Sequence, residues 1–147
     1  MSFKSYENSK FKKYTISQLK IGKKVSITRV INNTFLTESL NYLKDNHPIH
    51  TSSEWAKSLG YKKKIIPGFA ITSFFSNLIG TKLPGIYCVI MNLNFTFKSP
   101  VYVNDKLTFI CKISKIHKLF KVVKLELFVI KKNTKVVLGI ASCKILK

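Results

Sequence analysis

The amino-acid sequence predicts an α+β fold in which a curved antiparallel sheet wraps around a long central helix. The stretch from Pro67 to Gly80 is the longest uncharged run in a lysine-rich chain, and apolar side chains cover most of its circumference, which indicates a buried helix. The segments that follow alternate apolar and polar residues, as antiparallel strands with one packed face do. Helices followed by a run of strands are typical of the α+β class.

Length and charge limit the organisation and the partners. The chain has 147 residues and a net charge of +20, and we expect a flexible basic leader over residues 1–13 and a single domain over residues 14–147. Arg29 is the only arginine among 26 basic residues. Readers of nucleic acid rely on arginine forks, so we expect no nucleic-acid partner. The leader lacks the apolar core of a signal peptide, and no stretch reaches the roughly 20 apolar residues that cross a bilayer, so we expect a cytoplasmic protein without membrane contact.

The first half predicts one strand and two helices before the central helix. Residues 23–31 alternate and indicate a strand. Thr34 can cap a helix that runs through Leu43, with an apolar stripe at Leu36, Leu40 and Leu43. Residues 51–54 have the spacing of a capping box, so a short helix should follow and end at Gly60, with Trp55 and Leu59 facing the core.

The second half predicts four strands. Over residues 89–98, one face carries Met91, Leu93, Phe95 and Phe97. Asn104 and Asp105 mark a turn, and the next inward face contains Leu107, Phe109, Cys111 and Ile113. Residues 119–130 and 135–146 are expected to form the last two strands, joined by a hairpin at residues 131–134.

Candidate chemistry concentrates in the segment Asp45-Asn46-His47-Pro48-Ile49-His50. It holds one of six acidic residues and two of three histidines, and Pro48 stiffens it. A carboxylate and an imidazole that share one water form a general acid–base pair, which could add water to an activated double bond or remove it. The exposed N–H groups at the start of the central helix, around Gly68, offer donors for charge that develops on a carbonyl oxygen.

The residues also carry a resemblance. Asp45-x-His47-Pro-Ile-His50, Ile66-Pro67-Gly68-Phe69, Ser73-x-x-Ser76 and Ser99-Pro100-Val101-x-x-x-Asp105 occur in an order and spacing similar to the MaoC-like, or (R)-specific enoyl-CoA hydratase, family, over roughly residues 20–146. The resemblance implies a hot-dog fold and a hydro-lyase. Such an enzyme adds water to enoyl thioesters, in a syn manner, or dehydrates (R)-3-hydroxyacyl thioesters. It also implies a homodimer or a dimer of dimers.

Residue roles come from the same resemblance. Asp45 and His50 match the catalytic pair, Gly68 matches the glycine whose N–H holds the thioester oxygen, and Ser76 matches a supporting serine. We expect His47 to support or line the pocket, and Ile66 and Phe69 to contact substrate. The family most often has Asn at the position of His47 and His at the position of Pro67, and neither position transfers a proton. The division of acid and base roles between Asp45 and His50 stays open.

Two other functions remain as alternatives. A hot-dog thioesterase usually has a carboxylate on or near the central helix, but residues 68–80 contain no Asp or Glu. A non-catalytic acyl-thioester-binding protein would have little reason to keep a polar pair in an apolar pocket. We expect no cofactor beyond the coenzyme A or acyl carrier protein that carries the acyl group. We also expect no metal, because the histidine spacing is not that of a ligand set and the three cysteines lack CxxC spacing.

Overall fold

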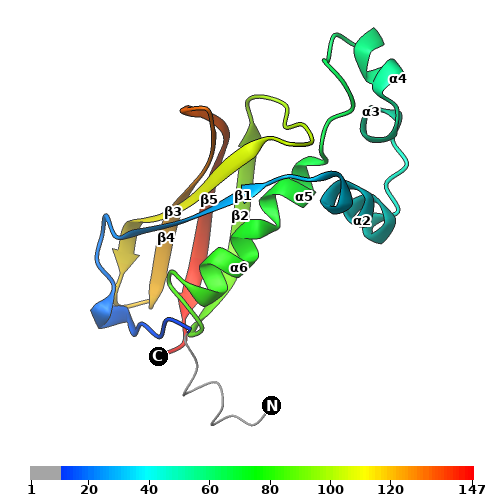
Figure 1. Cartoon of the computed structure of the whole chain (residues 1–147). Coiled ribbons are helices and arrows are strands. Elements are labelled where there is room, and N and C mark those ends of the chain that lie inside the picture. The colour runs from blue at the N-terminus through cyan, green and yellow to red at the C-terminus, as the bar shows by residue number, and fades with distance from the viewer. Residues whose placement is uncertain (1–10) are drawn as a thin grey trace.

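A computed structural model describes residues 11–147 of the chain (Figure 1). In chain order its elements are η1 (Ile16–Gln18), β1 (Lys24–Val30), α2 (Asn33–Leu43), α3 (Pro48–Thr51), α4 (Ser53–Ser58), α5 (Gly68–Thr72), α6 (Phe74–Thr81), β2 (Cys88–Phe97), β3 (Lys106–His117), β4 (Val122–Lys131) and β5 (Thr134–Ile145). Most of the expected leader, residues 1–10, lies outside the described residues. Residues 12 and 13 are held in place, since Lys12 O accepts from Ile86 N at 3.0 Å and Lys13 forms a bridge with Gly85.

The five strands form one antiparallel sheet with the order β1-β3-β4-β5-β2. Figure 1 shows the sheet curving around α6, which lies across one of its faces. Strands β3, β4 and β5 each pair with the strand next to them in the sequence. The hairpin between β4 and β5 turns at Lys132 and Asn133, which have φ values of 46° and 65°. Left-handed backbone at both central positions suits a two-residue hairpin, so the predicted turn is confirmed. This architecture is the predicted hot-dog fold.

The core lies between α6 and the concave face of the sheet. The predicted inward residues of β3, which are Leu107, Phe109, Cys111 and Ile113, are all 0 % exposed. Phe74 and Phe75 reach the Phe109 ring, with centroid distances of 4.9 and 5.6 Å. Aromatic pairs at such separations add to the stabilisation that burial provides. The alternation in this strand therefore predicted its packing correctly.

The central helix differs from the prediction in two respects. The run that was expected to form one helix is divided at Ser73 into α5 and α6. Thr72 Oγ1 and Ser73 Oγ donate to carbonyls of the preceding turn, and such bonds locally disturb helices. The second difference is that α5 and α6 are buried on one side only. On the other side, Phe69 is 81 % exposed and Ser76 is exposed in the single chain. Apolar side chains all round therefore did not mean burial all round.

Strand β2 is an edge strand, and its predicted face is wrong at one residue. The register shifts between Ile90 and Asn92, so Ile90 lies opposite buried Cys143, while Leu93 lies opposite buried Ala141. Residues directly opposite each other share a face. The bulge therefore removes Met91 from the face that Leu93, Phe95 and Phe97 occupy. Met91, Leu93 and Phe97 are 61 %, 42 % and 51 % exposed, because none of residues 11–147 covers this edge.

The helices α2, α3 and α4 lie beside the sheet and project away from it (Figure 1). Asn32 rather than Thr34 caps α2, since its side chain accepts from Phe35 N at 2.8 Å. Ser52 caps α4, so the capping box predicted at residues 51–54 is wrong. Trp55 and Leu59, which were predicted to face the core, are 40 % and 52 % exposed.

Strand β4 begins later than predicted. The fourth strand was predicted to begin at residue 119 but begins at Val122, because Leu119 and Phe120 belong to the exposed turn after β3.

Among residues 11–147, no helix is both long and apolar enough to span a bilayer.

Candidate functional site

Asp45 lies directly after α2, at the point where the chain reverses toward α3. Lys44 ends the helix in the left-handed conformation, with φ of 54°, and Asp45 N donates to Leu40 O at 3.1 Å. The Asp45 carboxylate accepts from His47 N at 3.0 Å through Oδ1. Such a turn, closed by a side chain two residues earlier, is typical of Asp. This hydrogen bond engages Oδ1 of Asp45 and does not involve Oδ2.

His50 lies on α3, and its ring is held by the segment that leads to the central helix. Its Nδ1 is 2.9 Å from Ile65 O. A carbonyl oxygen can only accept, so Nδ1 carries the proton and the lone pair of the neutral ring lies on Nε2. Ile65 N in turn donates to Ile49 O at 3.0 Å. The two segments therefore fix both the tautomer and the orientation of His50.

The structure brings Asp45 and His50 together. His50 Nε2 and Asp45 Oδ2 are 3.8 Å apart, and their side chains are 15 % and 31 % exposed. This distance exceeds that of a direct hydrogen bond. Both atoms are acceptors when the ring is neutral and the carboxyl is ionised, so the pair presents two acceptors to one small donor.

A largely apolar cleft of about 370 Å³ begins at His50. Four predicted site residues line it: His50, Ile66, Gly68 and Phe69. The cleft thus joins the imidazole to the start of α5. Its other walls are Tyr61, Ile65, Ile71, Phe97, Lys98, Ser99, Pro100, Val101 and Val137.

Gly68 is the first residue of α5, where the N–H has no acceptor within the helix. A Cβ at this position would lie 2.7 Å from Phe97 Cζ. Glycine was expected here to admit a substrate, and the structure adds a second reason, the close packing of the Phe97 ring. Phe97 is itself half exposed and lines the cleft.

Asp45, Ser76 and His47 do not line the cleft, although Asp45 approaches His50, which does. Ser76 is exposed on α6, and its side chain makes no hydrogen bond with residues 11–147 of the single chain. His47 caps α3, with Nδ1 accepting from Ile49 N at 3.1 Å, and its ring packs edge-on against Trp55. His47 therefore holds the helix that carries His50.

Several cleft residues had no role in the prediction, chiefly Tyr61 and the segment from Phe97 to Val101. Ile66 N donates to Val101 O at 2.8 Å, which brings this segment beside the start of α5. Residues 61–67 and 98–101 are irregular, so no periodic pattern predicts that they are neighbours. The only signals were Gly60-Tyr61 and Ser99-Pro100-Val101, and both came from the resemblance alone.

The three cysteine thiols lie outside the cleft. Cys88, Cys111 and Cys143 are free and belong to β2, β3 and β5, and none lines the cleft. Burial raises the pKa of the Cys111 thiol to about 12, and a hydrogen bond with Cys88 raises the pKa of Cys143 further above its usual range. Among residues 11–147, no three His, Cys, Asp or Glu side chains are grouped to hold a metal ion.

Comparisons with known proteins identify the family. A model of the MaoC like domain matches residues 17–134. An (R)-specific enoyl-CoA hydratase of Rhodospirillum rubrum is 28% identical over 90 residues, which are 61% of this chain and 62% of that protein. A mitochondrial 3-hydroxyacyl-[acyl-carrier-protein] dehydratase of Arabidopsis thaliana is 29% identical over 89 residues, which are 60% of this chain and 52% of that protein. The matched region therefore spans less than two thirds of either relative.

Solved structures show the same fold. An (R)-hydratase from A. caviae superposes with a TM-score of 0.81 at 23% identity, covering 86% of this chain and 97% of that one. An R-hydratase from Pseudomonas aeruginosa also gives a TM-score of 0.81 at 23% identity, covering 89% and 84%. Because the family match extends over most of the described residues, the chain belongs to the MaoC-like domain family.

Proposed function

We propose that this protein is a hydro-lyase that hydrates enoyl thioesters or dehydrates (R)-3-hydroxyacyl thioesters. The observation that supports it most is that His50, which lines the apolar cleft together with Gly68, has its Nε2 atom 3.8 Å from Asp45 Oδ2. The relatives named as hydratases and dehydratases act on thioesters of coenzyme A or of a carrier protein. The acyl group would occupy the cleft beside Ile66 and Phe69.

The pair can handle one water molecule. Water donates its hydrogens to Nε2 of His50 and Oδ2 of Asp45, which leaves an oxygen lone pair free to attack C3 of the enoyl group. The new C–O bond moves the electron pair of the double bond onto C2 and the thioester oxygen. The Asp45–His50 pair takes one proton from water and returns one to C2 from the same side of the cleft, so the addition is syn. Dehydration is the reverse sequence.

Gly68 would stabilise the charge that develops on the thioester oxygen. Its N–H has no intrahelical acceptor, and it lines the cleft that starts at His50. A donor aimed at a developing oxyanion contributes roughly 10² to 10³ in rate. His47 would act by holding α3, and Ser76 would act only where a second copy of the chain covers the exposed side of α6.

The exposed edge of the sheet supports a homodimer or a dimer of dimers. Met91, Leu93 and Phe97 are more than two-fifths exposed on β2, and Phe69 is 81 % exposed beside the cleft. An unpaired apolar edge strand is a template for pairing with another chain. Sedimentation of the purified protein tests this proposal, and Leu93→Lys should shift the protein toward monomer.

The three free cysteines also fit the reducing compartment expected of a cytoplasmic protein.

The test is the loss of conjugated enoyl-thioester absorbance when the protein meets crotonyl-CoA, with Asp45→Asn and His50→Ala beside the wild type. Loss of a positioned acid or base should lower the rate by about 10² to 10⁴. Release of free thiol would show thioester hydrolysis instead. An inactive wild type, tried also with longer acyl chains and carrier-linked substrate, would leave only the binding function.

A further inference from the structure

A second hollow, of about 560 Å³, opens beside the cleft and is lined by lysines. We call it the lysine groove, and its charged residues are Lys62, Lys63, Lys106, Lys131, Lys132 and Asp105. Five cations thus face one carboxylate. Such an excess of one sign in a hollow concentrates anions there.

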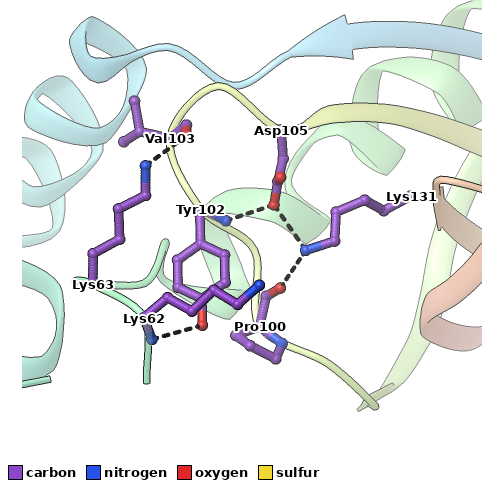
Figure 2. Close-up of polar contacts among 7 residues, drawn as sticks. All are labelled: Lys62, Lys63, Pro100, Tyr102, Val103, Asp105 and Lys131. Atoms are coloured by element: carbon purple, nitrogen blue, oxygen red, sulfur yellow. Dashed lines mark hydrogen bonds and ion pairs between the residues drawn. The ribbon is translucent and has the colours of Figure 1, made fainter. Parts of the chain in front are cut away.

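The groove is held together by specific contacts (Figure 2). Lys131 Nζ contacts Asp105 Oδ2 and Pro100 O, both at 2.9 Å, and Tyr102 N donates to the same carboxylate oxygen at 2.8 Å. On the other side of Tyr102, Lys63 Nζ donates to Val103 O at 3.2 Å. These bonds fix the loop after Pro100 against both the hairpin turn and residues 62–63. The walls therefore have a defined position before any ligand arrives.

Three ammonium groups remain available to a ligand. Lys62, Lys106 and Lys132 are exposed, and their side chains have no partner among residues 11–147. The Asp105 carboxylate is already occupied by Lys131 and Tyr102 N, which reduces its repulsion of an incoming anion. Lysine binds phosphate as a point charge with several donors.

The groove continues the walls of the cleft. Tyr61 lines the cleft and Lys62 lines the groove, while Pro100 and Val101 line the cleft and Tyr102 lines the groove. The two segments are tied where they pass from one hollow to the other, since Lys62 N donates to the Tyr102 hydroxyl at 3.4 Å. A ligand that reaches from one hollow into the other follows these two segments.

We propose that the lysine groove binds the phosphate groups of a coenzyme A thioester whose acyl end lies in the cleft. This inference rests on the proposed function and names the carrier. The pantetheine arm would pass along residues 61–62 and 100–102. Coenzyme A carries a diphosphate and a phosphomonoester, which match the three available lysines, Lys62, Lys106 and Lys132, better than the single phosphodiester on a carrier protein does. A hollow of this size also suits a small phosphorylated group, whereas a carrier protein needs a broad surface.

The first experiment compares crotonyl-CoA with crotonyl-pantetheine, which lacks the phosphates beyond the pantetheine arm. Lys62→Gln combined with Lys132→Gln should lower the preference for crotonyl-CoA, measured as the ratio of the two kcat/KM values, by about tenfold. Lys115→Gln combined with Lys118→Gln removes the same charge from exposed lysines outside the groove. That control should leave the ratio at the wild-type value. Raising the salt concentration should also lower the wild-type ratio, because screening weakens phosphate contacts.

A binding measurement separates this proposal from the hydratase reaction itself. Adenosine 3′,5′-bisphosphate should raise the melting temperature of the wild type and of the Lys115/Lys118 control but not of the Lys62/Lys132 variant, whether or not any enoyl thioester is hydrated. The proposal is overturned if the groove variant keeps the wild-type substrate ratio, if the control loses the ratio equally, or if only carrier-linked substrate is turned over. Activity on both small thioesters with an unchanged ratio would overturn the groove and leave the hydratase standing.

Discussion

The sheet with α6 and the segment of α2, α3 and α4 are built in contrasting ways. In β3 and β4 the inward side chains are fully buried, whereas only Leu36 and Ala56 are buried across α2, α3 and α4. The helical segment nevertheless carries Asp45 and His50. Buried apolar area provides most of the stability of a domain. The contrast teaches that most of the buried core belongs to the sheet and α6, while the helical segment supplies the two side chains to which the proposed chemistry is assigned.

The largest effect should fall on activity alone. Asp45→Asn is expected to lower the hydration rate by about 10² to 10⁴ and to change the free energy of unfolding by less than about 0.5 kcal/mol. The asparagine oxygen can still accept from His47 N, so the local turn should persist. Urea unfolding and initial rates, measured on the same preparation, check this. If stability fell along with activity, the pair would belong to the structural framework and the contrast would fail.

The next largest effect should fall on stability. Leu127 lies in the middle of β4 and is 0 % exposed, so Leu127→Ala should cost about 2–5 kcal/mol of unfolding free energy. Leu59→Ala deletes the same atoms at a site that is 52 % exposed after α4, and it should cost about 0.5 kcal/mol. Chemical denaturation of both variants measures the difference. Equal losses would show that the helical segment contributes to the core as much as the sheet does.

Asp105 provides an intermediate case, because it is an acidic residue in a structural role. It is 20 % exposed and bound by Lys131 Nζ at 2.9 Å and by Tyr102 N, unlike Asp45, whose Oδ2 is 3.8 Å from its partner. Asp105→Asn should therefore cost about 1–3 kcal/mol of stability. The double variant with Lys131→Met should lose less than the sum of the single variants. Additive losses would show that the two groups are not coupled.

The same contrast explains what the sequence could predict. Inward-facing residues of β3 recur every second position, so periodicity alone predicted that Phe109 and Cys111 are buried. Periodicity could not predict the bulge at Met91, because a bulge is an interruption of that period. Trp55 and Leu59 were misplaced for a different reason. Four-residue spacing puts two side chains on one face of a helix, but it does not say whether that face meets the sheet or solvent.

Residue patterns predicted the site where its parts are neighbours in sequence, and the resemblance added Gly68, which lines the cleft with His50. Asp45 and His50 are five positions apart in a segment stiffened by Pro48, and they do lie together. Tyr61 and Pro100 approach the cleft through irregular segments, and no local pattern links such distant positions. Lys62 and Lys63 could be read as a solvated loop from sequence. Their place opposite Lys106 and Lys132 depends on the tertiary fold.

The smallest effect concerns reactivity within the sheet, where exposure should decrease from the edge strand to the centre. Cys88 on β2 is half-buried, and a hydrogen bond from Cys143 lowers the pKa of its thiol, while burial raises the pKa of Cys111 to about 12. The thiolate is the reactive form, and its fraction falls about tenfold for each unit that the pKa exceeds the pH. Alkylation of the folded protein at pH 8, followed by peptide mass spectrometry, should modify Cys88 first and leave Cys111 unmodified. Labelling of Cys111 at the rate of Cys88 would show that the centre of the sheet opens as readily as its edge.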